Sequence, residues 1–291
     1  MRNGLIFDLG MHKGEDTEYY LRKGFTVVAV EANPKLAADV AYRLASYLKS
    51  GQLKILNKAI SEKDGPITFY DCETASIWGT IEKTWADRNI RLGAKIKEIN
   101  VEGIRFAHLL EDYGSPHYMK IDIEGADLLC LRTLLERNER PKFISIESSK
   151  MSFDDVITEF ALFEQLGYRK FKIIPQHLIG SQKLPNPPRE GTYVEHDFAI
   201  GCSGAFGLEL PGKWLSPEQA IKRYRWIHRL YRLTGDSGAL TSVKIVRSSL
   251  NKGRLQPNSL VGMAVRKIVK PVFRRLGLVT GWYDTHAMYT G

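Results

Sequence analysis

FDLGMHKGEDT, residues 7–17, joins a strand to a helix through a glycine turn. The apolar run Leu5–Phe7 precedes the turn, and a helical pattern over residues 16–22 follows it. The spacing is D-x-G-x-x-x-G and not G-x-G-x-x-G, the pattern whose three glycines admit a pyrophosphate. We therefore predict a binding loop for a nucleoside that has no phosphates and carries an amino-acid tail on a methylated sulfonium, as S-adenosylmethionine does.

An acidic residue stands at the end of the next predicted strand. Residues 26–30 form an apolar run that leads into Glu31, 21 residues beyond Gly10. A carboxylate at this distance can accept hydrogen bonds from both hydroxyls of a ribose. Glu31 therefore supports the prediction of a nucleoside site.

Strands and helices alternate through about the first 175 residues, which predicts a parallel sheet with helices on both faces. Ligands of such sheets bind beyond the carboxyl ends of the strands. Further strands are predicted at residues 53–56, 67–70, 99–104, 117–123, 142–147, 168–174 and 197–200, and further helices at residues 34–49, 126–137, 153–166 and 217–233.

Carboxylates gather at the predicted strand ends. Asp122 and Glu124 end the strand over residues 117–123, and Glu147 ends the next one. One of these acids, or His12, can take a proton from a hydroxyl that attacks a methyl group, an effect typically worth about 10²- to 10⁴-fold in rate. Alternatively, two of the acids hold a magnesium ion that lowers the pKa of the hydroxyl. The histidines outside the sheet are weaker candidates for the base: His177, His196 and His286.

Positive charge is concentrated near the end of the chain, whose net charge is +9. From residue 211 onward there are 15 Lys and Arg against 3 Asp and Glu, whereas residues 1–210 hold 27 against 30. We predict a binding domain over residues 1–210, with a lid-like insertion at about 72–100 and a loop at about 176–196. A basic, mainly helical extension over residues 211–291 follows, including an amphipathic helix at 262–276 that Pro271 should kink.

The cellular location is predicted from the cysteines and from the lack of a membrane span and a signal peptide in the sequence. Cys72, Cys130 and Cys202 are isolated, which indicates reduced thiols and neither disulfides nor a zinc site. No apolar run is long enough for a membrane span, and the first strand leaves no room for a signal peptide. We expect a cytoplasmic protein whose basic helix either packs its apolar stripe against the main domain or lies on the anionic inner face of the membrane.

With these motifs the chain resembles the FkbM-type methyltransferases, which use S-adenosylmethionine. The matching segments are FDLGMHKGEDT (7–17), VVAVEANP (27–34), NKAISEKDGPITFY (57–70) and MKIDIEGAD (119–127), and WYDTHA near the end is similar to tails of some bacterial members. The resemblance covers about residues 4–175 and departs from the common loop at His12, where the family usually has asparagine. It implies a class I, seven-stranded fold and methyl transfer to an oxygen, often a hydroxyl of a sugar or a polyketide-like product.

The resemblance also implies roles for individual residues. Glu31 takes the ribose, Ala59 or Ile60 flanks the adenine, and Asp122 lies beside the sulfonium and the acceptor. The residues implied to contact S-adenosylmethionine or its product S-adenosylhomocysteine are Asp8, Gly10, Met11, His12, Gly14, Thr17, Glu31, Ala32, Asn33, Ala59, Ile60 and Asp122. Lys120 is expected to support the strand by hydrogen bonding, while Trp78 and Trp85 either stack on a sugar or fill the core of the insertion.

Three other functions compete with transfer to a small-molecule or glycan acceptor. A nucleic-acid methyltransferase would use the basic tail. However, methylases that act on amino groups carry an Asn/Asp-Pro-Pro-aromatic turn where this chain has residues 122–125. Methylation at carbon 5 of cytosine needs a nucleophilic cysteine near the site, and Cys130 lies inside a predicted helix. A membrane-surface or partner-binding protein would keep only a vestigial fold. A dehydrogenase is the weakest rival, because the third glycine of its fingerprint is missing.

Overall fold

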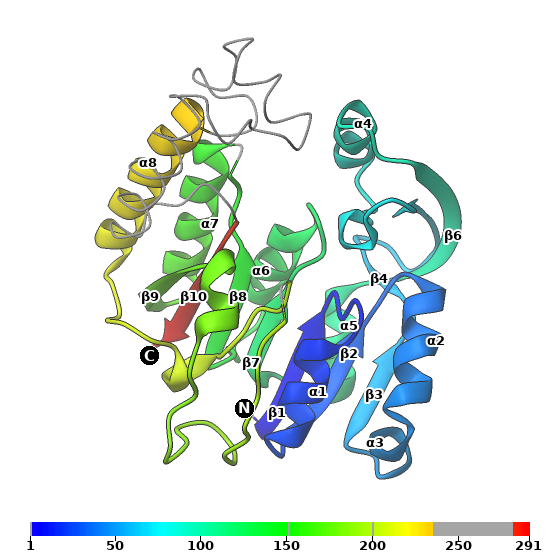
Figure 1. Ribbon diagram of the computed structural model, residues 1–291, viewed down its shortest axis with the longest axis horizontal. Coiled ribbons are helices and arrows are strands. Elements are labelled where there is room, and N and C mark those ends of the chain that lie inside the picture. Colours follow the sequence, from blue (N-terminus) through cyan, green and yellow to red (C-terminus); the bar gives the residue numbers. More distant parts are fainter. Residues whose placement is uncertain (1, 151, 200, 235–281) are drawn as a thin grey trace, which may run out of the picture.

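The computed structural model describes residues 2–150, 152–199, 201–234 and 282–291. A seven-stranded sheet with the order β3-β2-β1-β7-β8-β10-β9 forms its centre (Figure 1). Among the described strands of this sheet, β10 runs opposite to the other six, which confirms the predicted fold class. The strands are β1 (Arg2–Leu9), β2 (Thr26–Val30), β3 (Leu53–Leu56), β7 (Pro116–Ile121), β8 (Phe143–Glu147), β9 (Tyr168–Pro175) and β10 (Tyr283–Tyr289).

Two apolar cores lie on opposite faces of this sheet, because successive side chains of a strand point to opposite sides. Phe7 of β1 belongs to the core that contains Leu131 and Phe160, whereas its neighbour Ile6 packs in the core that contains Tyr20 and Phe206. The helices of the described residues are α1 (Glu15–Arg22), α2 (Pro34–Arg43), α3 (Ala45–Lys49), α4 (Lys83–Arg91), α5 (Phe106–Tyr113), α6 (Asp127–Leu135), α7 (Phe153–Gln165) and α8 (Pro217–Thr234), with short 3₁₀ turns η1 (Ser76–Trp78), η2 (Gln176–Ser181) and η3 (Gly207–Glu209).

The last strand of the sheet is not the one predicted. Residues 197–199 form no strand, and the place between β8 and β9 is taken by β10. Thr285 of β10 is buried, and its hydroxyl lies 2.6 Å from Ser148 Oγ and 2.8 Å from the hydroxyl of Tyr224 on α8. The predicted extension thus supplies a helix and also a central strand, while the helix expected at 262–276 lies outside the described residues.

A smaller, three-stranded sheet with the order β4-β6-β5 accompanies the large one. Its strands are β4 (Ala59–Ile60), β5 (Gly65–Cys72) and β6 (Ile96–Ile104), and η1 and α4 connect β5 to β6. The predicted insertion at 72–100 therefore consists of η1 and α4, followed by the first half of β6. In Figure 1 this unit, in cyan and teal, stands above β2 and β3. Among the helices of the described ranges, none combines the length and the apolar character needed to cross a membrane.

Candidate active site

A cavity of about 380 Å³ opens at the carboxyl ends of β1, β2, β7 and β8. This is the edge at which the sequence predicts a site. Most of its lining comes from the glycine loop, the ends of β2, β7 and β8, the β4–β5 unit with η1, the start of η2, and the residue before β10. The lining residues are Gly10, Met11, His12, Glu15, Asp16, Val30, Glu31, Ala32, Lys58, Ala59, Ile60, Phe69, Ser76, Ile77, Trp78, Gly79, Ile81, Lys120, Asp122, Ile123, Glu124, Glu147, Gln176, His177, Gly201 and Trp282.

Gly10 brings the loops after β1 and β7 into close contact. Its φ is 85°, and a Cβ at this position would lie 1.8 Å from the carbonyl oxygen of Asp122. The amides of Gly10 and Met11 both donate to the carbonyl of Val30 at 3.0 Å, which ties the loop to β2. Only glycine fits here, because an L side chain would meet both an unfavourable backbone conformation and the facing backbone.

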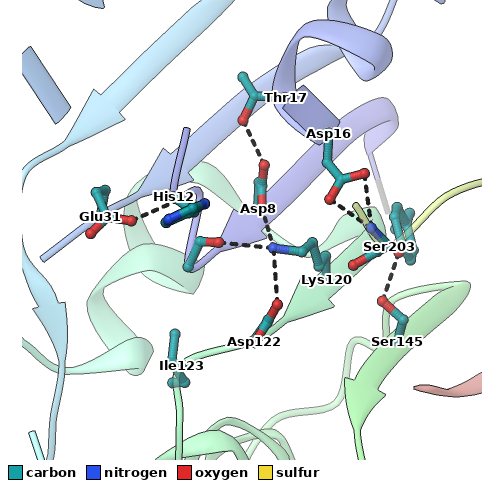
Figure 2. Close-up of polar contacts among 12 residues, drawn as sticks. Asp8, His12, Asp16, Thr17, Glu31, Lys120, Asp122, Ile123, Ser145 and Ser203 are labelled. Carbon is teal, nitrogen blue, oxygen red and sulfur yellow. Dashed lines mark hydrogen bonds and ion pairs between the residues drawn. The ribbon is translucent and has the colours of Figure 1, made fainter. Parts of the chain in front are cut away.

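Lys120 holds the loop from inside the sheet, which confirms its predicted supporting role (Figure 2). Its Nζ donates to the carbonyl of Gly10 at 2.8 Å and to Asp8 Oδ1 at 3.2 Å, and lies 3.8 Å from Asp122 Oδ2. Burial lowers the pKa of Lys120, but the carboxylates of Asp8, Asp122 and Asp16 outweigh it and raise this pKa well above its ordinary range. The lysine is therefore a permanent cation beneath the cavity.

Some residues that were implied to contact the cofactor lie behind the cavity wall instead. Asp8 is fully buried and accepts a hydrogen bond from Thr17 Oγ1 at 2.5 Å. A Cβ on Gly14 would lie 2.8 Å from Val40 Cγ1, so this glycine allows α1 to pack against α2. Asn33 caps α2 by accepting from the amides at 35 and 36. These residues shape the loop and its surroundings rather than line the cavity.

Glu31 binds His12 of the cofactor loop, residues 8–14 (Figure 2). The two carboxylate oxygens of Glu31 accept the amides of His12 at 2.7 Å and Asn33 at 2.8 Å, and each keeps a further lone pair for a ligand hydroxyl. Burial raises the pKa of Glu31 to about 7. His12 has a φ of 53° in the left-handed region, where asparagine and histidine are both enriched, and this explains the exchange with the family's usual asparagine.

The carboxylates expected at the strand ends do come together. Asp122, Glu124 and Glu147 each offer an oxygen within 4.8 Å of the others, a donor set that could hold a cation such as magnesium. Burial, followed by the charge of Asp122, raises the pKa of both Glu124 and Glu147 well above 4.5. The raised pKa values of the two glutamates favour their protonated forms more than those of ordinary exposed carboxyl groups.

The insertion forms one wall of the cavity. Ser76 Oγ lies 2.8 Å from His12 Nε2, and Thr80 Oγ1 donates to the carbonyl of Glu124 at 2.6 Å. The structure separates the two tryptophans, since Trp78 lines the cavity whereas Trp85 packs against Gly125. The insertion thus contacts both the cofactor loop and the loop of carboxylates.

The remaining histidines divide between the cavity and other places. His177 lines the cavity, and so η2 borders the site. His196 instead stacks near Tyr19 and Phe198. Burial lowers the pKa of His286 to about 3, so this residue stays neutral inside the sheet. His196 and His286 do not line the cavity.

Other lining residues were missed from the sequence. Asp16 lies within the first motif but signals only a helix start; burial raises its pKa to about 7, and it accepts the amide of Ser203 at 2.9 and 3.1 Å. Gln176 begins the predicted loop at 176–196 and Trp282 begins the segment WYDTHA, but neither pattern assigns a residue to the site. Gln176 donates to the carboxylate of Asp284, which places the start of β10 beside the cluster of carboxylates.

Asp284→Asn should stabilise the protein in a pH-dependent way. Burial raises the pKa of Asp284 from 3.8 to about 8, so the folded chain binds a proton that the unfolded chain has released. The carboxyl group therefore weakens folding progressively as pH rises from about 4 to 8 and no further above that. Urea unfolding should show a gain on the order of 1–2 kcal/mol for the variant at pH 8 and almost none near pH 4. A gain that does not grow with pH would contradict the burial of an ionisable Asp284.

Comparison with known proteins identifies the family. A family model described as the methyltransferase FkbM domain matches residues 8–170, which is more than half of the chain. No curated protein matches the chain. The match includes the glycine loop, Glu31 and the carboxylates at residues 122, 124 and 147.

Solved structures are only distantly similar. A S-adenosylmethionine-dependent methyltransferase from Thiobacillus denitrificans, in complex with S-adenosyl-L-homocysteine, is 10% identical over 99% of this chain and 86% of its own, with a TM-score of 0.33. One from Geobacter sulfurreducens, in the same type of complex, is 10% identical over 99% and 85%, with a TM-score of 0.34. The family match does not depend on these likenesses. The chain belongs to the FkbM methyltransferase family, and it is a methyltransferase with S-adenosylmethionine as its cofactor.

Proposed function

We propose that this protein methylates a hydroxyl oxygen of a sugar, a glycan or a related secondary metabolite. The observation that carries the proposal is the cluster of Asp122, Glu124 and Glu147, which faces the same cavity as the cofactor loop and has raised glutamate pKa values. A hydroxyl needs a base when it attacks a methyl group, and a carboxylate with a raised pKa is a stronger base than an ordinary one and suits that task. The cluster therefore favours an oxygen acceptor.

Methyl transfer is an in-line displacement at carbon. The acceptor oxygen forms a bond to the methyl carbon, the carbon–sulfur bond breaks with its electron pair going to sulfur, and the hydroxyl proton passes to one carboxylate of the cluster. The protein aligns oxygen and carbon at about 3–3.5 Å. Glu31 and the glycine loop would hold the cofactor, while the cluster would orient the acceptor and receive its proton. If two of the acids instead bind magnesium, the ion lowers the pKa of the hydroxyl.

The composition of the cavity wall supports a sugar as the acceptor. Phe69, Trp78 and Trp282 line the cavity together with the carboxylates. Aromatic faces pack against the C–H side of a sugar ring, and carboxylates accept hydrogen bonds from its hydroxyls. Such a mixture of apolar surface and few polar groups is typical of small-molecule sites.

A labelled-methyl assay tests the proposal. The purified full chain is incubated with labelled S-adenosylmethionine and with nucleotide sugars, glycans, glycosylated metabolites or RNA, with and without EDTA. We expect label in an alkali-stable ether on a sugar or metabolite hydroxyl. Label found on RNA alone, or on nitrogen, would overturn the proposal. Loss of activity with EDTA and its return with magnesium would assign the proton transfer to a metal-bound hydroxyl.

The value of kcat/KM should fall on the acidic side of the pH profile, and the fall should begin at a higher pH than for an ordinary carboxyl group. The base must be ionised to act, and the pKa values of Glu124 and Glu147 lie well above 4.5 because of burial and then the neighbouring Asp122. Below the apparent pKa of the cluster, kcat/KM should therefore fall about tenfold per pH unit. Measurement of kcat/KM between about pH 5 and 10 checks this. A profile that is flat down to the ordinary carboxyl range would show that these acids do not act as the base.

A further inference from the structure

A second cavity, of about 350 Å³, lies against β9 and shares no lining residue with the catalytic one. Its lining includes three cations, Lys172, Lys183 and Arg189, beside the ring of Trp214. The remaining lining residues are Pro185, Leu208, Glu209, Leu210, Pro211 and Gly212. The volume falls within the range of small-molecule sites.

Lys172 is the unusual member of this lining. The residue is 5% exposed, and its Nζ donates to the carbonyl of Leu210 at 2.5 Å and lies 4.6 Å from the centre of the Trp214 ring. Within the described ranges, it has no carboxylate at ion-pair distance. Lysine is almost never fully buried unless it is paired, because a desolvated ammonium is costly without a counter-ion. An ammonium has three donors, so Lys172 retains donors for a further acceptor.

The surroundings of Lys172 do not neutralise it. Glu209 lines the cavity, but its carboxylate lies 2.9 Å from Lys23 Nζ, so its charge is already matched. His286, which is aligned with Lys172 across β10 and β9, is neutral. Burial, followed by the charge of Arg189, lowers the pKa of Lys172 to about 8. An anion between the cations would offset both the cost of burying the ammonium and its repulsion by Arg189.

We propose that this cavity binds the phosphate group of a small phosphorylated molecule. The buried ammonium of Lys172 would contact the phosphate directly, and Lys183 and Arg189, both exposed at the rim, would complete the charge. Phosphate oxygens form strong charge-assisted hydrogen bonds with lysine and arginine. The apolar residues beside them leave room for the organic part of the molecule. The inference is independent of the methyl acceptor.

Calorimetric titration of the full chain with inorganic phosphate, pyrophosphate and a hexose phosphate tests this site, with sodium chloride of equal ionic strength as the reference. We expect saturable binding that Lys172→Met weakens by about tenfold or more. Lys170→Met is the matched control, because Lys170 is an exposed residue of the same strand and does not line the cavity. It should change the Kd less than about twofold. The Kd for S-adenosylhomocysteine should be unchanged in both variants.

Two outcomes would overturn the site: no saturable binding of any of the three anions, or equal weakening by Lys172→Met and Lys170→Met. If Lys172→Met does not fold, Lys183→Gln and Arg189→Gln replace it, since both change exposed side chains, and each should weaken binding by about threefold or more. Binding of the protein to vesicles that contain phosphatidic acid distinguishes a lipid headgroup from a soluble phosphorylated molecule as the source of the phosphate. Their binding is sensitive to these variants only when the site accepts a lipid headgroup.

Discussion

Asp122→Asn, Glu124→Gln and Glu147→Gln should each reduce kcat, by about 10²- to 10⁴-fold for the residue that acts as the base, while S-adenosylhomocysteine still binds. The three side chains line the cavity, and their oxygens lie within 4.8 Å of one another. An amide keeps the shape of the carboxyl group but cannot take a proton. The variant with the largest loss identifies the base, and calorimetry with S-adenosylhomocysteine separates lost chemistry from lost cofactor binding.

Glu136→Gln serves as the control for these variants, because Glu136 is an exposed residue at the end of α6 outside the cavity. It should retain full turnover. Asp122→Asn should also reduce stability, since Asp122 lies 3.8 Å from the buried ammonium of Lys120. Unimpaired turnover in all three cavity variants would reject the carboxylates as the base.

Gly10→Ala should abolish binding of S-adenosylhomocysteine and destabilise the fold by on the order of 3–5 kcal/mol. An added Cβ would lie 1.8 Å from the carbonyl oxygen of Asp122, which is backbone and cannot rotate away. The loops after β1 and β7 would have to separate. That movement breaks the hydrogen bonds from the Gly10 amide to Val30 and from Lys120 to the Gly10 carbonyl. Urea unfolding and calorimetry measure the two effects.

Gly65→Ala is the matched control for this substitution. Gly65 has a φ of 98°, but a Cβ there would have no atom within 4 Å. The control therefore carries only the conformational penalty, on the order of 1–2 kcal/mol, and should bind S-adenosylhomocysteine normally. If Gly10→Ala is no more disruptive than Gly65→Ala, the close approach of the two loops is wrong.

Much of the sheet was predictable, because its central strands are apolar runs that end in motif residues. Residues 27–30 and 143–146 are buried without interruption, and runs of this kind indicate strands that are covered on both faces. β10 could not be recognised in the same way. It places Asp284, Thr285 and His286 in the interior, so its pattern does not look like a buried strand. For Asp284 and Thr285, hydrogen bonds to distant residues replace apolar packing.

The site was predictable in its position but only partly in its composition. Strand ends identified Glu31, Asp122 and Glu147, since parallel strands bring their carboxyl ends to one edge. A motif residue can line the cavity or support it from behind, and packing between helices decides which, as Gly14 shows. The spacing of motif residues in the sequence does not reveal this packing. Trp282 was missed because it reaches the cavity through the pairing of β10, more than 100 residues after β9.

The position of β10 between β8 and β9 also has a consequence for folding kinetics. Gln176 and Asp284 are 108 residues apart, and Lys142 and Tyr289 are 147 apart. Pairing across such distances slows folding, because closing a long chain segment costs conformational entropy before the new contacts stabilise the structure. β1, β2, β3 and β7 can assemble early, whereas β9, in the part of the chain that the structure describes, joins the sheet through β10. Since Trp282 arrives with β10, appearance of methyl transfer during refolding should coincide with the slowest step and report complete assembly of the sheet.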